Sequence, residues 1–141
     1  MKSGVRALGI AESFTGDSST LAGAVVRASR VSDGFVFGTC TVGGSDATDA
    51  ILDMVDRLDR PDVRYLLVAG IAPAWFNLLD LHALHERTGL PVLSITFEES
   101  AGLEAVLREE FSGVALARRL DTYRAQPARE RVTVNDETIF V

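Results

Sequence analysis

Cysteine, lysine and long apolar runs are scarce in this sequence of 141 residues. Cys40 is the single cysteine, so no internal disulfide can form, which is typical of the reducing cytoplasm. No apolar run reaches the roughly 20 residues of a membrane-spanning helix. The opening residues, MKSGVRALGIAESF, lack the apolar core and cleavage pattern of an export signal. We therefore expect a cytoplasmic protein with no membrane partner.

Lysine is nearly absent although charged residues are plentiful. Of the 14 basic residues only Lys2 is a lysine, and 20 acidic residues bring the net charge to −6. An acidic excess with arginine in place of lysine is typical of a halophile's cytoplasm, where a dense carboxylate surface keeps proteins soluble. Nucleic-acid binding usually requires a basic footprint, so any such footprint here must be local.

Apolar residues are abundant, and their order indicates the fold. They make up 47% of the chain, enough for the core of one domain spanning residues 1–141. The first part predicts three strands joined by short turns, an antiparallel meander. The strands are expected at Val5–Ile10, Leu21–Ser29 and Phe35–Val42, with a polar turn at residues 14–19 and a hairpin turn at Ser32-Asp33-Gly34.

The remainder of the chain alternates helices and strands. Apolar residues at positions 47, 51, 55 and 58 predict an amphipathic helix, capped by Ser45 or Asp46. We expect further helices at residues 77–88, 100–111 and 114–125, strands at residues 63–71 and 92–96, and a small hairpin formed by residues 131–134 and 137–141.

This order of elements predicts a mixed five-stranded sheet flanked by helices. Right-handed crossovers place the fourth and fifth strands beside the first, which gives the strand order 3-2-1-4-5. The second strand is then antiparallel to both of its neighbours, and the first strand is central. This is the ribonuclease H-like arrangement of an α/β protein, here with a small C-terminal hairpin.

Four ordered motifs resemble a known family. They are GIAESF at residues 9–14, VGGSDATDAI at 42–51, AGIAPAWFNLLDL at 69–81 and TGLPVLSIT at 88–96. Together they resemble the archaeal "domain of unknown function ninety-nine" family, which is similar to endonuclease V. The resemblance runs from Arg6 to the end of the chain. Relatives usually continue into another helical segment, so we expect that this chain, ending at Phe140-Val141, lacks the family's last C-terminal segment.

The resemblance implies a chemistry for which two residues are missing. Hydrolases of this type hold Mg²⁺ between carboxylates at the ends of the first and fourth strands, where it activates water and stabilises the leaving oxygen. The corresponding positions here are Ala11 and Ala69, and a methyl group cannot ligate a metal. We therefore expect a non-catalytic protein that binds DNA, RNA or another protein, with no certain cofactor.

The alternative is a metal-dependent nucleic-acid endonuclease with a rebuilt carboxylate site. Its Mg²⁺ ligands and catalytic candidates are Glu12 and Asp46, with Asp80 as a further ligand. Glu12 follows Ala11 and so points to the opposite face, provided that the strand continues through it. Asp46 and Asp80 also suit helix N-termini, the second of them three residues after a cap at Asn77, and we favour capping over metal binding.

Candidate binding residues lie on the loops at this edge of the sheet. The loop at residues 71–76 places the only tryptophan beside a phenylalanine. Either both rings fold into the core, or they form an exposed anchor for a base or for self-association with a second subunit. The Arg-rich stretch from Arg118 to Arg131 is the local basic footprint. The candidate binding residues are Ser13, Phe14, Asp46, Thr48, Trp75, Phe76, Asn77 and Asp80.

Other reactive residues have simpler explanations. His82 and His85 share a helix face but lack a third zinc ligand at the usual spacing. Ser13 has no partnered histidine, and Gly43-Gly44 is not followed by the lysine of a phosphate-binding loop. Cys40 lies in the middle of a strand, where we expect it to be part of the core.

Overall fold

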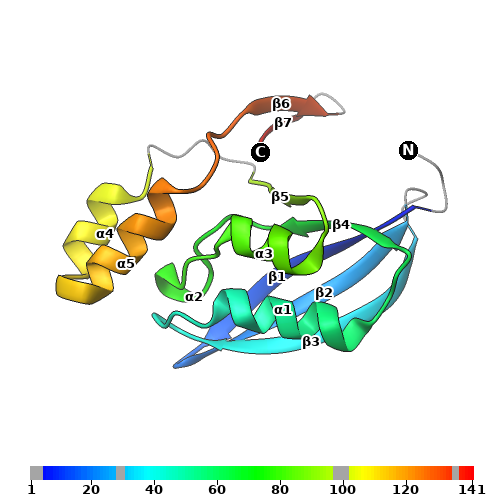
Figure 1. Ribbon diagram of the computed structural model, residues 1–141, viewed down its shortest axis with the longest axis horizontal. Coiled ribbons are helices and arrows are strands. Elements are labelled where there is room, and N and C mark those ends of the chain that lie inside the picture. The colour runs from blue at the N-terminus through cyan, green and yellow to red at the C-terminus, as the bar shows by residue number, and fades with distance from the viewer. Residues whose placement is uncertain (1–4, 28–30, 97–101, 135–136) are drawn as a thin grey trace.

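The computed structural model describes residues 5–27, 31–96, 102–134 and 137–141. A five-stranded mixed sheet of order β3-β2-β1-β4-β5 forms its centre (Figure 1). β2 is antiparallel to β1 and β3, whereas β4 is parallel to β1 and β5. The predicted strand order is thus confirmed, with β1 in the middle. The strands are β1 (Arg6–Thr15), β2 (Ser18–Arg27), β3 (Ser32–Thr41), β4 (Val63–Val68) and β5 (Val92–Ser94).

The meander has longer strands, and a tighter first turn, than the sequence predicted. β1 and β2 pair from Arg6 and Arg27 to Thr15 and Ser18, which leaves only Gly16 and Asp17 in the turn. The predicted hairpin turn at residues 32–34 is wrong, because these residues lie in β3. Turn-type residues are tolerated there because Asp33 is used for ion pairing rather than for turning the chain. The predicted end of the second strand, at residues 28–29, lies outside the described residues.

Helices α1 (Ala47–Leu58) and α3 (Leu81–Thr88) cover the same face of the sheet (Figure 1). Glycine allows α1 to approach closely, since a Cβ at Gly38 would lie 2.8 Å from Met54. Full burial stabilises an aliphatic side chain by about 1.5–3 kcal/mol, so this layer supplies most of the cohesion. Its completely buried large side chains are Leu8, Leu21, Ile51, Met54, Leu66 and Leu84.

The segment after β4 departs from the predicted helix at residues 77–88. A short turn, α2 (Pro73–Phe76), has left-handed φ angles of 50, 55 and 58° at Ala74, Trp75 and Phe76. The chain then passes through Leu78 and Leu79, which pack into two different apolar clusters. Adjacent residues on opposite sides are typical of an extended backbone, and α3 starts after Asp80 rather than at Asn77.

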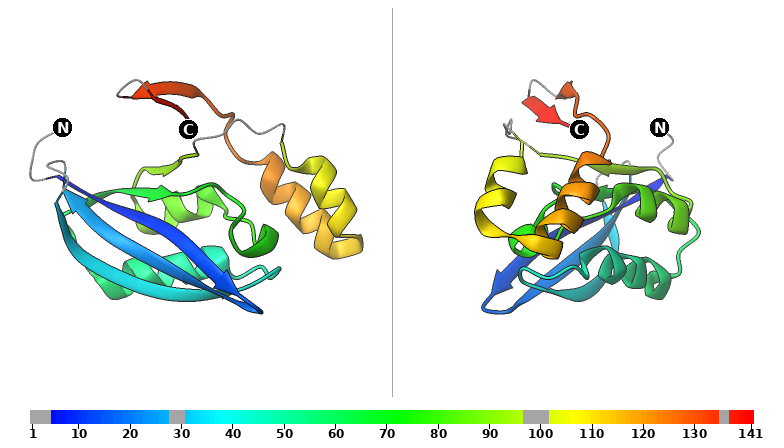
Figure 2. Two further views of the ribbon diagram at one scale, coloured as in Figure 1. Left: turned by 180° about the vertical axis from the view of Figure 1, so that it is seen from behind. Right: turned by 60° about the vertical axis from the view of Figure 1, so that its left-hand side comes forward.

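Helices α4 (Glu104–Glu110) and α5 (Gly113–Arg124) form a pair beside α2 (Figure 2). Their cluster contains buried Leu78, Leu107 and Leu120, with Phe76 and Phe111 packed against it. The predicted terminal hairpin is confirmed as β6 (Arg131–Val134) and β7 (Glu137–Phe140). It is joined to the end of β5 by paired backbone hydrogen bonds between Thr96 and Phe140. In the described part of the chain, no helix is both long and apolar enough to span a membrane.

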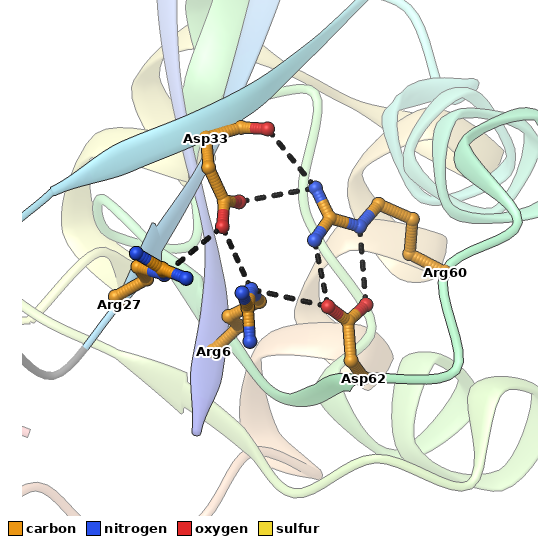
Figure 3. A network of polar contacts seen from close by, with 5 residues as sticks. All are labelled: Arg6, Arg27, Asp33, Arg60 and Asp62. Carbon is orange, nitrogen blue, oxygen red and sulfur yellow. Dashed lines mark hydrogen bonds and ion pairs between the residues drawn. The ribbon is translucent and has the colours of Figure 1, made fainter. Parts of the chain in front are cut away.

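An ionic network closes one end of the sheet, where β1, β3 and β4 begin and β2 ends (Figure 3). Asp33 accepts from Arg6 at 2.8 Å and from Arg60 at 3.0 Å, and pairs with Arg27 at 3.2 Å. Asp62 pairs with Arg60 at 2.6 Å and with Arg6 at 3.1 Å. The hydrogen bond from Arg6, reinforced by Arg60, outweighs desolvation and lowers the pKa of Asp33. This network fixes the end of the sheet opposite to the candidate site.

Candidate functional site

Ala11 and Ala69 lie side by side where β1 and β4 approach their C-terminal ends. The backbone N–H of Ala69 donates to the carbonyl of Ile10 at 3.3 Å, which continues the parallel pairing beyond β4. Ile10 and Val68 are buried under the helices, so the next residue in each strand points to the opposite face. Both alanines are accordingly exposed. The two positions that the family resemblance assigns to metal-binding acids are thus adjacent methyl groups.

Glu12 lies in the continuous strand β1 and faces the helix-covered side, away from the side chain of Ala11. The backbone N–H of Ala74 lies 2.9 Å from each of its carboxylate oxygens. The hydroxyl of the fully buried Ser19 donates to Oε2 at 2.6 Å. Glu12 therefore ties β1 and β2 to the left-handed turn of α2, and its charge is used to hold the loop.

Asp46 occupies the N-cap position of α1, but its carboxylate makes no capping bond to the helix. It accepts hydrogen bonds from the backbone N–H of Thr41 at 3.0 Å, the Thr41 hydroxyl at 2.9 Å and Nδ2 of Asn77 at 2.7 Å. Burial opposes ionisation of this carboxyl, yet these hydrogen bonds outweigh it and lower its pKa. The carboxylate is held charged by protein donors.

The sequence predicted that Asn77 begins a helix, and this is wrong. Asn77 instead caps α1, which is distant in sequence. Its Oδ1 accepts from the backbone N–H of Ala47, the first residue of α1, at 3.0 Å. Its Nδ2 donates to the carbonyl of Thr41 at 2.9 Å as well as to Asp46. Asp80 is the true N-cap of α3, because its Oδ1 accepts from Ala83 N–H at 3.0 Å. The prediction that Asp80 follows a cap at Asn77 is therefore wrong.

The two aromatic residues of α2 have different surroundings. The sequence predicted that both rings are in the core or that both are exposed, but Phe76 is packed against a core cluster and Trp75 is exposed. Phe76 packs edge-on against Phe111, with ring centroids 6.3 Å apart. Trp75 is 49% exposed and rests edge-on against Phe76 at 5.1 Å. Of these two rings, Trp75 is the one exposed to a ligand.

Arg119 is the residue that reasoning from the sequence missed. It was included only in the basic stretch, but it is 9% exposed. Its guanidinium donates to the carbonyls of Phe76, Gly43 and Gly44 at 3.1, 2.7 and 2.9 Å, and lies 3.8 Å from the ring centre of Phe111. Burial lowers its pKa. Its position on the same helical stripe as Leu116 was the available signal.

The other arginines of this stretch are also largely engaged. Arg124 pairs with Glu104 of α4. Arg129 donates to the hydroxyl of Thr96 at 2.6 Å and to the carbonyl of Phe140 at 2.7 Å. Arg118 is exposed on α5. The basic footprint is therefore narrower than the sequence suggested, and most of its charge supports the packing of the C-terminal elements.

The remaining predicted residues have structural contacts in this region. The Thr48 hydroxyl accepts from the backbone N–H of Asp80 at 3.0 Å, which links α1 to the start of α3. Ser13 and Phe14 continue β1 and pair with Thr20 and Ser19.

The two histidines and the cysteine are likewise accounted for. His82 and His85 each contact a backbone carbonyl, of Ala125 at 2.6 Å and of Leu90 at 2.7 Å. Cys40 is in the core, as expected. Burial raises the pKa of its thiol, and the nearby charges of Asp46 and Glu12 raise it further, so both carboxylates lie within electrostatic reach of Cys40.

A cleft of about 880 Å³ separates the strand ends from the C-terminal elements. Ala69 and Glu12 are among the residues that line it from the sheet, and Tyr123, Arg129 and Arg131 from the C-terminal side. Most of the remaining lining comes from the loop after β4, from β5, and from the segment between α5 and β6, which adds the acidic Glu130. The volume of this cleft is within the range of small-molecule binding sites, and its lining carries charges of both signs.

The residues present do not fit the two-metal chemistry of the endonuclease V comparison. Mg²⁺ requires oxygen ligands that converge at about 2.0–2.1 Å. Glu12 and Asp46 each already accept from protein donors, and Asp80 caps α3. Within the described ranges, no group of three or more His, Cys, Asp or Glu side chains could hold a metal ion. The carboxylates that remain near Ala11 and Ala69 already accept hydrogen bonds that hold the fold together.

The sheet order, the helices on it and the loops at its edge define an α/β domain of the endonuclease V-like type. Ciona intestinalis endonuclease V, solved with inosine-containing DNA, matches with a TM-score of 0.51 and 6% identity over 96% of this chain and 69% of that chain. A protein of unknown function from Archaeoglobus fulgidus matches with a TM-score of 0.81 and 24% identity over 96% of this chain and 76% of that one. Both likenesses concern the fold alone.

The sequence model of the Endonuclease dU family matches residues 3–141, and the chain belongs to that family. A UPF0215 protein of Methanopyrus kandleri is 42% identical over 99 residues, which cover 67% of this chain and 50% of that protein. A UPF0215 protein of Methanothermobacter thermautotrophicus is 34% identical over 119 residues, or 79% of this chain and 58% of that protein. The chain thus spans about half the length of these archaeal relatives.

Proposed function

We propose that this chain binds nucleic acid without cleaving it. The family description and the inosine-containing DNA in the endonuclease V complex support nucleic acid as the ligand. The single observation that carries the loss of cleavage is the pair of adjacent methyl groups, Ala11 and Ala69, at the strand ends. Without those two carboxylates, little negative charge remains to offset the dehydration of Mg²⁺.

The hydrogen bonds that Glu12 already accepts argue against a rebuilt catalytic site. Its carboxylate oxygens already accept hydrogen bonds from Ser19 and from the strained backbone at Ala74, so a metal ion would compete with these donors. Hydrogen bonds to a charged group contribute roughly 1.5–3 kcal/mol each, and residues with left-handed backbone already cost about 1–3 kcal/mol. Metal binding by Glu12 would therefore be weakened to the extent that it displaces these donors. Asp46 is constrained in the same way by Thr41 and Asn77.

The proposed ligand surface consists of the cleft and Trp75. An exposed indole can stack on a base, a contact that contributes about 1–3 kcal/mol per base. Arg129 and Arg131 line the cleft and lie near the ring of Phe140, with guanidinium carbons 6.0 and 5.7 Å from its centre. Both add positive charge to the cleft, which favours contact with phosphates, while Arg129 also donates to Thr96 and Phe140.

Binding and cleavage assays with the same oligonucleotides test this function. We expect single strands of DNA or RNA containing inosine or deoxyuridine to be retained intact with either Mg²⁺ or Mn²⁺. Assays should include high salt, because the acidic composition indicates a halophilic cytoplasm, and a low-salt series, because salt weakens phosphate contacts. Trp75→Ala should weaken binding, whereas Val114→Ala, on α5 and 68% exposed, serves as the matched control.

Restoring the acids provides the converse test. Ala11→Asp or Ala69→Asp alone should have little effect, because two-metal catalysis needs its carboxylates together. The double variant should bind metal measurably more tightly. Cleavage by the unmodified protein that requires metal and is abolished by Glu12→Gln or Asp46→Asn would instead establish an endonuclease with a rebuilt site.

A further inference from the structure

The face of β1, β2 and β3 that points away from α1 is open to solvent. Figure 2 shows it from behind, with no helix of the described chain lying over it. Phe35 and Phe37 of the edge strand β3 are 64% and 59% exposed on this face. A Cβ at Gly9, in the central strand, would meet no atom within 4 Å, whereas one at Gly38, on the opposite face, would meet Met54 at 2.8 Å. Only one face of the meander is packed.

The open face has a ridge beside a trough. The ridge is the pair of phenylalanine rings on β3, and the trough is formed by glycine and alanine on β2 and β1. Small side chains leave a hollow between the edge strand and β4 that large apolar groups can fill. Two rows of paired residues cross the strands: Phe35, Ala24 and Gly9, and Phe37, Ala22 and Ala11.

This face is also uncharged, although the chain has 20 acidic residues and a net charge of −6. The remaining residues facing the same way are Ala7, Ser13, Thr20, Val26 and Thr39. Two copies of an acidic protein repel each other wherever carboxylates meet. An uncharged sheet face is the surface on which two copies can approach with the least repulsion.

We propose that a second copy of this chain packs on this face. A two-fold dimer requires one surface to be complementary to itself. The ridge and trough satisfy that requirement, since Phe35 and Phe37 of each protomer fill the small-residue trough of the other. Stacked sheets lie about 10 Å apart, a spacing that side chains of this size bridge.

The size of the face sets the strength of the dimer. Three strands of ten residues, at about 3.3 Å per residue and 4.8 Å between strands, give a face of roughly 500 Å². Two such faces bury about 1,000 Å² in total, which is close to the lower limit for a specific interface. The dimer is therefore reversible and depends on protein concentration. The dimer does not use Trp75 or the cleft, although Ala11 belongs both to this face and to the candidate site.

Sedimentation equilibrium across a concentration series tests the dimer, in salt high enough to screen the net charge. The unmodified chain should shift from monomer to dimer. Phe37→Asp and Ala22→Arg should each reduce the association constant at least about thirtyfold, the effect of a central interface residue. Circular dichroism and thermal melting confirm that both variants are folded.

Two matched variants define what the result means. Val114→Asp makes the same kind of change at a residue that is 68% exposed on α5, and Trp75→Asp does so at the loop of α2. Both should leave the dimer intact. A chain that stays monomeric throughout the series, forms a larger oligomer, or loses its dimer in Trp75→Asp but not in Phe37→Asp would overturn the proposal.

Discussion

Replacement of Asn77 by alanine should be among the most destabilising single changes in this protein. Asn77 is completely buried and joins three segments that are distant in sequence: the end of β3, the start of α1 and the loop before α3. Alanine removes all three side-chain hydrogen bonds. It also leaves the backbone N–H of Ala47, another completely buried residue, without its acceptor.

The magnitude follows from the type of each bond. The bonds to Ala47 and Thr41 are neutral and contribute about 1 kcal/mol each, whereas the bond to the Asp46 carboxylate contributes about 1.5–3 kcal/mol. The expected loss in the free energy of unfolding is therefore about 3–5 kcal/mol. For a chain of this length, each kcal/mol lowers Tm by about 3 °C, so Tm should fall by about 10–15 °C.

Urea denaturation followed by circular dichroism measures this loss. Asn77→Asp is the informative companion, because it keeps the acceptor for Ala47 but turns the donor toward Asp46 into a second carboxylate. It should be strongly destabilised at neutral pH and partly recover in acid, when one of the two carboxyls becomes protonated. A loss of less than about 1 kcal/mol for Asn77→Ala would refute the assignment of Asn77 as the cap of α1.

Three further predictions concern charge and the α2 loop. The pKa values of Asp33 and Asp46 lie below their ordinary value of 3.8. The stability that these carboxylates contribute is therefore present above about pH 4 and is lost as pH falls through their folded pKa values. Asp33→Asn should make the urea midpoint less dependent on pH in the acid range. Arg119→Met keeps the aliphatic bulk but removes the donors to four carbonyls, those of Phe76, Ala115, Gly43 and Gly44. It should cost about 2–3 kcal/mol in urea denaturation, with Arg119→Lys losing less. The single tryptophan should report binding directly, through saturable fluorescence quenching by an oligonucleotide that disappears in Trp75→Phe.

The sheet was predictable because its determinants are local. Alternation of buried and exposed residues defines the strands, and the right-handed crossover rule orders them. The same alternation placed Glu12 and Ala11 on opposite faces of β1. Asp33 shows where local signals fail, since its turn-like neighbours are overridden by arginines from three other segments.

The loop of α2 could not be predicted from its own residues. Ala74, Trp75 and Phe76 have no local preference for the left-handed region, which L-residues with side chains disfavour. Their backbone is held by Glu12 and by Arg119, which are distant in sequence. The candidate site therefore depends on long-range contacts, and the sequence shows only that alanine occupies the two positions that the family resemblance assigns to acids.

Titration of the unmodified protein with Mn²⁺ tests the central claim most directly. The claim is that the strand ends have lost their metal site while the fold remains. In high salt, calorimetry should detect no saturable Mn²⁺ binding to the unmodified chain, and should detect it in the double variant Ala11→Asp, Ala69→Asp. Saturable binding to the unmodified chain that Glu12→Gln removes and the surface change Asp53→Asn leaves intact would contradict the account.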